Sequence, residues 1–127
     1  MVKALFDTNI LIDYLNGITA AKTELDRYSG KDDKAISVVT WMEVLVGTTP
    51  ETDNVTRGFL AGFQSLPIDA QVASRSVEIR KNHKIKLPDA IVWATAQVHG
   101  RILVTRNTKD FAEDEPGVRV PYRLQMS

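Results

Sequence analysis

Short apolar runs alternate with helical segments along the chain, and this alternation limits the folds open to it. The apolar runs occupy residues 2–6, 34–39, 67–69, 101–105 and 118–122. Helical spacing and end signals favour helices at residues 8–17, 19–30, 40–47, 48–66, 70–83 and 87–100. The pattern predicts a three-layer α/β fold, Rossmann-like, in which helices cover both faces of a short, mostly parallel sheet. Ligands of such sheets collect at the carboxyl ends of the strands.

Length and composition exclude several kinds of protein. The chain has 127 residues, which predicts a single domain over 1–127 with a core that needs no disulfide. It has no cysteine, so disulfides, thiolate metal sites and cysteine nucleophiles are excluded. Neither a signal-peptide pattern nor an apolar run of membrane-spanning length occurs in the sequence. We therefore expect a soluble, cytoplasmic protein with no membrane partner.

Charge is balanced overall but unevenly distributed. Residues 1–69 carry 6 Lys and Arg against 10 Asp and Glu, whereas residues 70–127 carry 10 against 6. The basic half contains a group of residues just before Asp89. Its members are Arg75, Arg80, Lys81, Lys84 and Lys86. Such a group can follow nucleic-acid phosphates or simply form a solvated helix end, and its position beside Asp89 favours RNA contact.

Four acidic residues lie at or near the ends of predicted strands, or at the start of the helix that follows. Asp7 separates the first strand from the first helix, and Asp89 opens the last predicted helix. Asp110 follows the fourth strand in a polar loop. Glu43 lies in a helix that is apolar on nearly every side, so we expect this helix to be buried. Asp13, in contrast, is expected on a helix face turned to water.

Each of the four acids also has an ordinary structural explanation. Asp7 can cap its helix, Asp89 can complement a helix dipole, and Asp110 can be a turn residue. Glu43 can pair with an arginine or face water. Together, however, they are expected to share one edge of the sheet, where like charges raise each other's pKa. A divalent cation relieves this repulsion, and carboxylates with water suit Mg²⁺ or Mn²⁺. Such a site favours the attack of water on phosphodiesters.

Four segments that contain these acids resemble, in order and spacing, the motifs of PIN-domain ribonucleases, and most closely those of VapC-type toxins. The segments are FDTNILIDYL, ISVVTWMEVLVG, LPDAIVWATAQVHG and ILVTRNTKDF. The resemblance implies a PIN-like fold and a Mg²⁺-dependent endoribonuclease, with Mn²⁺ as a substitute. It implies that Asp7 and Asp89 bind the metal, while Glu43 and Asp110 complete the acidic cluster directly or through water. All four are candidate catalytic residues.

Polar residues around the acids have supporting roles in this comparison. Thr8, Asn9 and Thr105 match family positions that orient carboxylates or waters. Arg106 lies beside Asn107 and is well placed to hold substrate. Asn107 stands where some PIN domains carry another acid, so one metal ion is expected and a second is left open. The resemblance also implies a homodimer that cleaves RNA and is silenced by a cognate antitoxin, whose C-terminal segment lies over the active-site groove and presents an arginine to the acids.

Two alternatives remain open at this stage. One is a catalytically weak PIN module that binds RNA or an antitoxin, although four intact acids argue against it. The other is a nuclease that acts on DNA. Two further phosphate chemistries are excluded, because a phosphatase of the haloacid dehalogenase kind needs an acid at Asn9 and because the sequence has no P-loop. The RNA target, the cut sequence and the identity of the antitoxin are not encoded in any motif that we find.

Overall fold

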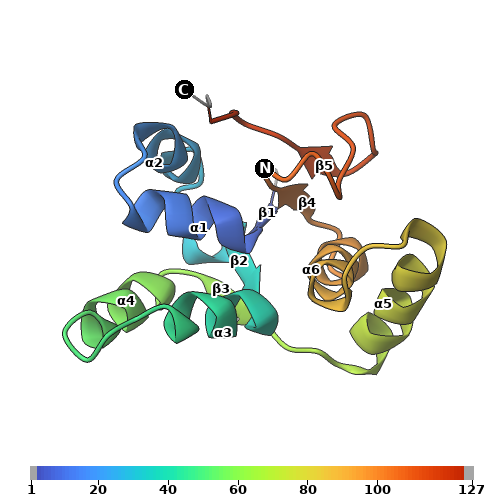
Figure 1. Cartoon of the computed structure of the whole chain (residues 1–127), viewed down its shortest axis with the longest axis horizontal. Helices are drawn as coiled ribbons and strands as arrows, with labels where there is room; N and C mark the ends of the chain where they lie inside the picture. The colour runs from blue at the N-terminus through green and yellow to red at the C-terminus, as the bar shows by residue number, and fades with distance from the viewer. Residues whose placement is uncertain (1–2, 125–127) are drawn as a thin grey trace.

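A parallel sheet forms the centre of the molecule (Figure 1). The computed structural model describes residues 3–124, and Val2, expected in the first strand, lies outside them. Within this range the sheet has five strands in the order β3-β2-β1-β4-β5, and every neighbouring pair is parallel. The strands are β1 (Ala4–Phe6), β2 (Lys34–Ser37), β3 (Gln64–Leu66), β4 (Ile102–Val104) and β5 (Val118–Arg119). The predicted α/β class is confirmed, and the sheet is parallel throughout rather than mostly so.

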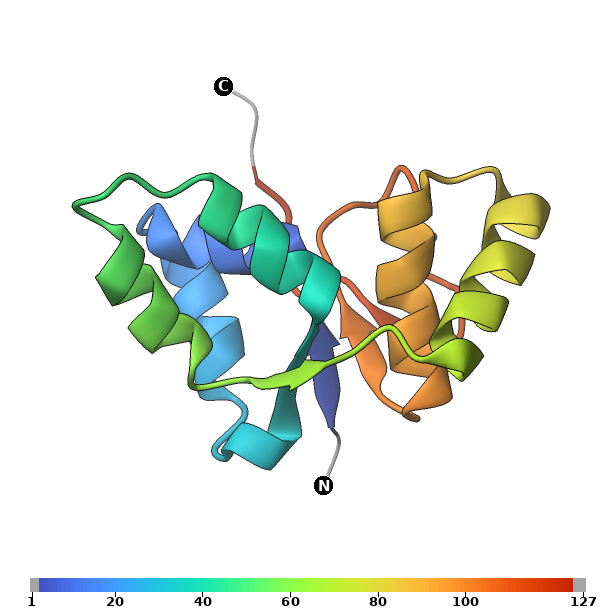
Figure 2. The ribbon, with the colours of Figure 1, turned by 90° about the horizontal axis from the view of Figure 1, so that it is seen from below.

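Helices cover both faces of the sheet and complete three layers (Figure 2). They are α1 (Thr8–Leu15), α2 (Thr19–Asp26), α3 (Val38–Val46), α4 (Asp53–Leu60), α5 (Ala70–His83) and α6 (Leu87–Val98), with a short 3-10 helix at Lys31–Asp33. Helices α5 and α6 lie together on one side, and α1 to α4 lie on the other. From β1 the chain adds β2 and β3 on one side of the sheet, and it then adds β4 and β5 on the other side. The point between β1 and β4, where this direction changes, is where open parallel sheets bind their ligands.

Alternate side chains of the strands enter two separate hydrophobic clusters. Leu5 and Leu103 pack with residues of α5 and α6. Phe6, Ile36 and Val104 point to the opposite face and pack with residues of α1, α2, α3 and α4. This alternation is the period-two geometry of a strand that is covered on both faces. All three residues of β1 are fully buried, so β1 is a rigid platform for the residue that follows it.

Two predicted boundaries in the middle of the chain are wrong. The third strand is β3, at Gln64–Leu66, whereas the apolar pattern predicts it at 67–69. Helix α4 spans Asp53–Leu60, whereas the sequence favours a helix over residues 48–66. The Thr52 hydroxyl accepts a hydrogen bond of 2.9 Å from the Thr49 amide, which makes a turn of this segment. Residues 64–66 are extended because they pair with β2, so tertiary pairing overrides the local helix signal.

Helix α3 begins two residues before the predicted position of 40. The Ser37 hydroxyl caps it by accepting a hydrogen bond of 3.1 Å from the Val39 amide. Strand β2 therefore passes into α3 without a loop, just as β1 passes into α1. Between residues 3 and 124, none of the helices combines the length and the apolar character that crossing a membrane requires.

Candidate active site

Asp7 is the first residue after β1 and the N-cap of α1. Its backbone is extended, with φ −71° and ψ 155°, and its Oδ1 accepts a hydrogen bond of 2.8 Å from the Thr8 amide. Only 4% of Asp7 is exposed. Asp7 therefore does cap α1, as one of its structural explanations predicts. A single capping bond nevertheless uses only one carboxylate oxygen, and a surface cap does not need to be buried.

The second oxygen of Asp7 is held by two side chains from separate elements. Its Oδ2 accepts a hydrogen bond of 2.8 Å from Thr105 Oγ1 and one of 3.1 Å from Asn9 Nδ2. Thr105 is the residue after β4 and is fully buried. Its hydroxyl also accepts a hydrogen bond of 3.0 Å from the Asn107 amide. Asn9 and Thr105 thus orient the Asp7 carboxylate, as the family resemblance implies for these positions.

Glu43 lies on the exposed side of α3, which corrects the expectation of a buried helix. Met42 and Val46 on the same helix are also exposed, by 46% and 85%. The apolar composition of α3 is therefore only partly used for core packing, and the side of α3 that carries Glu43 faces water. Thr8 Oγ1 donates a hydrogen bond of 2.6 Å to Glu43 Oε1 and lies 3.0 Å from the buried Thr40 hydroxyl. Thr8, the neighbour of Asp7 in the chain, thus contacts the acid of α3.

The charges of the other three acids of the site act on Asp89. It lies in the first turn of α6 and is partly buried. Burial, the charges of Asp7, Asp110 and Glu43, and a hydrogen bond with Asp110 together raise the pKa of the Asp89 carboxyl to about 6, and burial has the largest effect. The structure therefore gathers the four predicted acids into one electrostatically coupled cluster at the carboxyl edge of the sheet.

Asp7 and Asp110 are each held by neighbouring polar side chains. Burial raises the pKa of Asp7, and the hydrogen bonds from Thr105, Thr8 and Asn9 offset part of that rise. Asp110 is held by Asn107, whose Nδ2 donates a hydrogen bond of 3.0 Å to Asp110 Oδ2. The Asp110 amide donates in return to Asn107 Oδ1 at 3.2 Å. Asn107 therefore orients Asp110.

The donor set fits a hard cation that keeps most of its own waters. No three His, Asp or Glu side chains among residues 3–124 lie close enough together to bind a metal ion jointly. A site that needs three or more protein ligands is therefore not present in this arrangement. Mg²⁺ takes one or two carboxylates directly and fills its remaining positions with water, so the acids present suit it. Burial first, and then the charges of neighbouring acids, raise the pKa of Asp7 and Asp89, and a bound cation would favour the ionised form of both.

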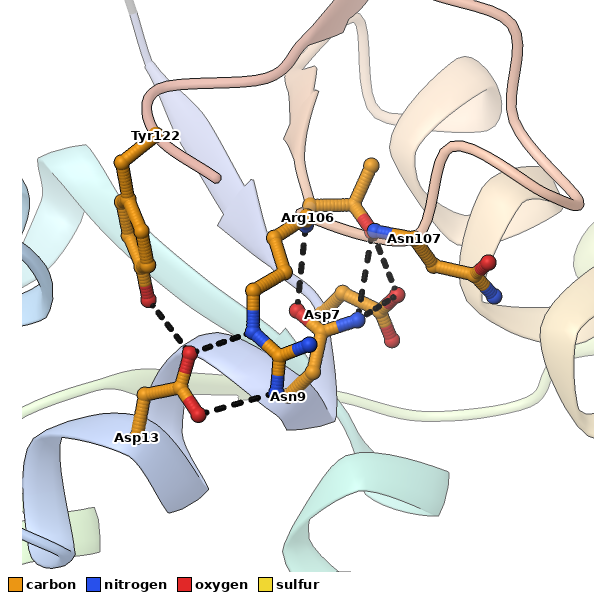
Figure 3. Close-up of polar contacts among 7 residues, drawn as sticks. Asp7, Asn9, Asp13, Arg106, Asn107 and Tyr122 are labelled. Atoms are coloured by element: carbon orange, nitrogen blue, oxygen red, sulfur yellow. Dashed lines mark hydrogen bonds and ion pairs between the residues drawn. The ribbon is translucent and has the colours of Figure 1, made fainter. Parts of the chain in front are cut away.

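Asp13 is buried, whereas the sequence predicts a helix face turned to water. It is 4% exposed rather than turned to water, and its carboxylate binds Arg106 and Tyr122 (Figure 3). Asp13 lies three residues after Ile10, on the buried side of α1, and this helical spacing is the signal that could have identified it. The Arg106 guanidinium, expected to hold substrate, is occupied by Asp13.

A groove opens next to Glu43, between α1, α3 and the segment that leads into α4. Its volume is about 440 Å³. Ile12, Leu15 and Val55 line it with apolar surface, and they are exposed by 39%, 41% and 74%. Glu43 and Glu51 add negative charge to this lining. The acidic cluster and an apolar groove thus share the residue Glu43.

The family of this chain follows from its match to known proteins. The PIN domain profile matches residues 4–113. The chain belongs to the PIN-domain family. Within that family, this PIN domain is 34% identical over 113 residues to Ribonuclease VapC10 of Mycobacterium tuberculosis, a match that covers 84% of each chain. It is 31% identical over 122 residues to the tRNA(fMet)-specific endonuclease VapC of Shigella flexneri, covering 87% of this chain and 91% of that one.

The PIN domain also resembles a solved toxin–antitoxin complex from Klebsiella pneumoniae. The TM-score is 0.90 and the identity 49%, over 96% of this chain and 100% of the matched chain. Together these relatives confirm the predicted resemblance, a VapC-type ribonuclease toxin with a PIN-like fold. Nucleases of this kind typically depend on a metal ion. The roles of individual acids, the identity of the ion and the partners of this PIN domain are taken up below.

Proposed function

We propose that this PIN domain is a Mg²⁺-dependent endoribonuclease, with Mn²⁺ as a substitute ion, and that it acts as the toxin of a toxin–antitoxin pair. The observation that carries the proposal is the acidic cluster, in which burial and then the charges of Asp7, Asp110 and Glu43 raise the pKa of Asp89. Charges crowded in this way are costly unless they have a function or a cation. We also propose that residues 1–127 act as one PIN domain.

In this proposal the four acids have different roles. Asp7 and Asp89 would hold the metal ion, since both combine burial with a raised pKa. When bound, the ion lowers the pKa of a coordinated water and offsets the charge that develops on the phosphate. Glu43 is exposed and held by Thr8, so it can orient the attacking water or accept its proton. Asp110, oriented by Asn107, supports the same waters. The products would carry a 5′-phosphate and a 3′-hydroxyl, as the family resemblance implies.

The basic group before Asp89 offers a path for the RNA backbone. Four of its members are exposed: Arg80, Lys81, Lys84 and Lys86. Lys86 is the N-cap residue of α6, three positions before Asp89, so its charge lies close to the acids in the chain. Arg75 is different, because its guanidinium donates to Gln97 Oε1 and Glu78 Oε2. Exposed charge near a cleavage site is sufficient for phosphate contacts, which require no base-specific geometry.

The antitoxin is proposed to bind the groove beside Glu43. The Klebsiella relative was solved as a toxin–antitoxin complex. The exposed Ile12, Leu15 and Val55 suit an apolar segment of a partner, and Glu43 suits a basic residue at its end. The expected homodimer and the expected cytoplasmic location remain predictions. Light scattering of the purified protein tests the dimer.

A cleavage assay with three arms tests the proposed function. Purified protein is incubated with structured RNA in Mg²⁺, with excess EDTA, and as the Asp7→Asn variant. We expect cleavage only in the first arm. Asp26→Asn is the matched control, because Asp26 is an exposed acid of α2 paired with Lys22. Cleavage that survives EDTA and Asp7→Asn would contradict the metal mechanism. Preference for a DNA substrate of the same sequence would favour the DNA nuclease, and binding of RNA without turnover would favour the catalytically weak module.

A further inference from the structure

A buried carboxylate outside the acidic cluster binds two partners from the C-terminal third of the chain (Figure 3). Asp13 Oδ2 accepts a hydrogen bond of 2.5 Å from Arg106 Nε, and Asp13 Oδ1 accepts one of 2.9 Å from Arg106 Nη2. The Tyr122 hydroxyl donates to Asp13 Oδ2 at 2.8 Å. The side chain of Asp13 is 5% exposed and that of Arg106 is 31% exposed. Three polar groups are thus ordered together where α1 meets the core.

Arg106 stands between residues that touch the acids. Its backbone amide donates a hydrogen bond of 3.2 Å to Asn9 Oδ1, and Asn9 in turn donates to Asp7. The preceding residue, Thr105, also donates to Asp7. The following residue, Asn107, donates to Asp110. A shift of Arg106 would therefore move the partners of two of the four acids.

The geometry points to Asp13 as a positioning residue for the acidic cluster. Through Arg106, and with Tyr122, it fixes residues 105–107 so that Thr105 meets Asp7 and Asn107 meets Asp110. This inference rests on the proposed metal-dependent function. Stability alone is a poor explanation for the contact, because a buried ion pair is often no better than an apolar side chain of similar size. Groups that orient metal ligands, in contrast, strongly affect metal affinity.

The chain contains a second cluster of the same construction, which serves as a matched control. Glu24 of α2 is 3% exposed and accepts two hydrogen bonds, of 2.8 and 2.9 Å, from Arg119. The Tyr28 hydroxyl also lies 3.4 Å from Glu24 Oε2. Arg119 lies on β5, at the edge of the sheet, and its guanidinium donates to Glu24 rather than to any of the four acids. Its backbone carbonyl accepts a hydrogen bond of 3.0 Å from the Thr105 amide, as part of the pairing of β4 with β5. Loss of charge at Asp13 or at Glu24 should therefore destabilise the fold similarly, while only Asp13 holds the side chain of Arg106, which lies between Thr105 and Asn107.

The test compares Asp13→Asn with Glu24→Gln by three measurements. We expect Asp13→Asn to raise the dissociation constant for Mn²⁺, measured by calorimetry, about 10-fold. We expect it to lower kcat for RNA while leaving KM within about twofold, because substrate contacts are unchanged. Amide hydrogen exchange at residues 105–110 should accelerate. At a temperature where both variants are folded, Glu24→Gln should leave the Mn²⁺ dissociation constant, kcat and amide exchange at residues 106–110 unchanged. The Thr105 amide is left out of this comparison, because it donates to the carbonyl of Arg119, the partner of Glu24. Tyr122→Phe, which removes only the hydroxyl donor, should have a smaller effect of the same kind.

Three results would overturn the inference. Equal changes in Mn²⁺ affinity for Asp13→Asn and Glu24→Gln would reduce Asp13 to a stabilising role. A raised KM with unchanged Mn²⁺ affinity would mean that Arg106 contacts the RNA and that Asp13 acts on substrate binding. Unchanged exchange at residues 105–110 would mean that Asp13 does not fix this segment. The proposed function is tested separately, and it fails if the wild-type protein binds Mn²⁺ but does not cleave RNA. In that case the comparison of Mn²⁺ affinity and amide exchange between Asp13→Asn and Glu24→Gln still tests the role of Asp13.

Discussion

Thr105 Oγ1 donates a hydrogen bond of 2.8 Å to Asp7 Oδ2, which joins residues 98 positions apart in the chain. Each is the first residue after a strand, and those strands pair in parallel with Phe6 opposite Val104. The pairing register of β1 and β4 therefore carries both side chains to the same point at the edge of the sheet. The surroundings of the buried acid are a direct consequence of strand register.

Thr105→Val should weaken this arrangement. The variant keeps the side-chain shape but leaves the buried Asp7 carboxylate without one of its donors. We expect the free energy of unfolding to fall by about 1–3 kcal/mol, measured by urea denaturation. Thr95→Val is the matched control, because Thr95 is equally buried but its hydroxyl donates to the Ile91 carbonyl within its own helix. Equal losses in the two variants would show that the Thr105 hydroxyl has no special importance to Asp7.

The raised pKa of Asp89 predicts a pH dependence of stability in the metal-free protein. Its ordinary value is 3.8, and in the fold it is about 6. The folded state therefore holds the proton more tightly than the unfolded chain does, so this contribution to stability is fully present below about pH 4 and is lost as pH rises through 6. Asp7, whose pKa is also raised, acts in the same direction.

Thermal melts in EDTA at several pH values check this dependence. We expect the melting temperature of the wild type, relative to that of Asp89→Asn, to fall between pH 5 and pH 7. Added Mg²⁺ should reverse the trend by stabilising the wild type more at pH 7 than at pH 5, because the ion binds the ionised carboxylates. Parallel curves for the two proteins in EDTA would contradict the proposed charge crowding at Asp89.

Glu43→Gln should separate activity from stability. Glu43 is exposed, and the amide oxygen of glutamine can still accept the hydrogen bond from Thr8, so the melting temperature should change little. Loss of the carboxylate should lower the rate of RNA cleavage by about 10²-fold or more, the range of a general base. Glu51→Gln, at another exposed acid of the same groove, should leave the rate unchanged. A Glu43→Gln protein with full activity would remove Glu43 from the catalytic set.

Lys86→Gln tests the proposed path of the RNA backbone. Removing one phosphate contact should raise KM for RNA and make the logarithm of KM less dependent on the logarithm of salt concentration, by about 1 unit of slope. Lys22→Gln is the control, since Lys22 is an exposed lysine of α2 paired with Asp26. KM and salt slope that are the same for both variants would indicate that the basic group before Asp89 is only a solvated helix end.

The parts of the fold that depend on local pattern could be predicted from the sequence. Asp7, Asp89 and Asp110 follow strands or open helices, and a parallel sheet necessarily brings such positions to one edge. The third strand could not be predicted in this way. Its residues, Gln64–Leu66, become a strand because β2 is available to pair with them. Pairing between segments far apart in the chain cannot be recognised from the residues of one short segment.

The misplaced side chains have the same origin. Glu43 was expected to be buried because its neighbours in α3 are apolar, but burial is decided by what covers a helix, and this side of α3 is exposed. Asp13 was assigned to water because it is charged, although helical spacing places it on the buried side of α1. Its partners, Arg106 and Tyr122, lie 93 and 109 residues further along the chain, so a buried ion pair could not be recognised from α1 alone.

Paramagnetic NMR is the most direct test of whether the gathered acids bind a divalent cation. Substoichiometric Mn²⁺ is added to ¹⁵N-labelled protein, and the loss of backbone amide signals is mapped along the chain. We expect the signals of residues 7–9, 89–90 and 105–110 to broaden first, and the effect to disappear in Asp7→Asn. Broadening centred on another part of the chain, or the same broadening in Asp7→Asn, would contradict a metal site built on Asp7 and Asp89.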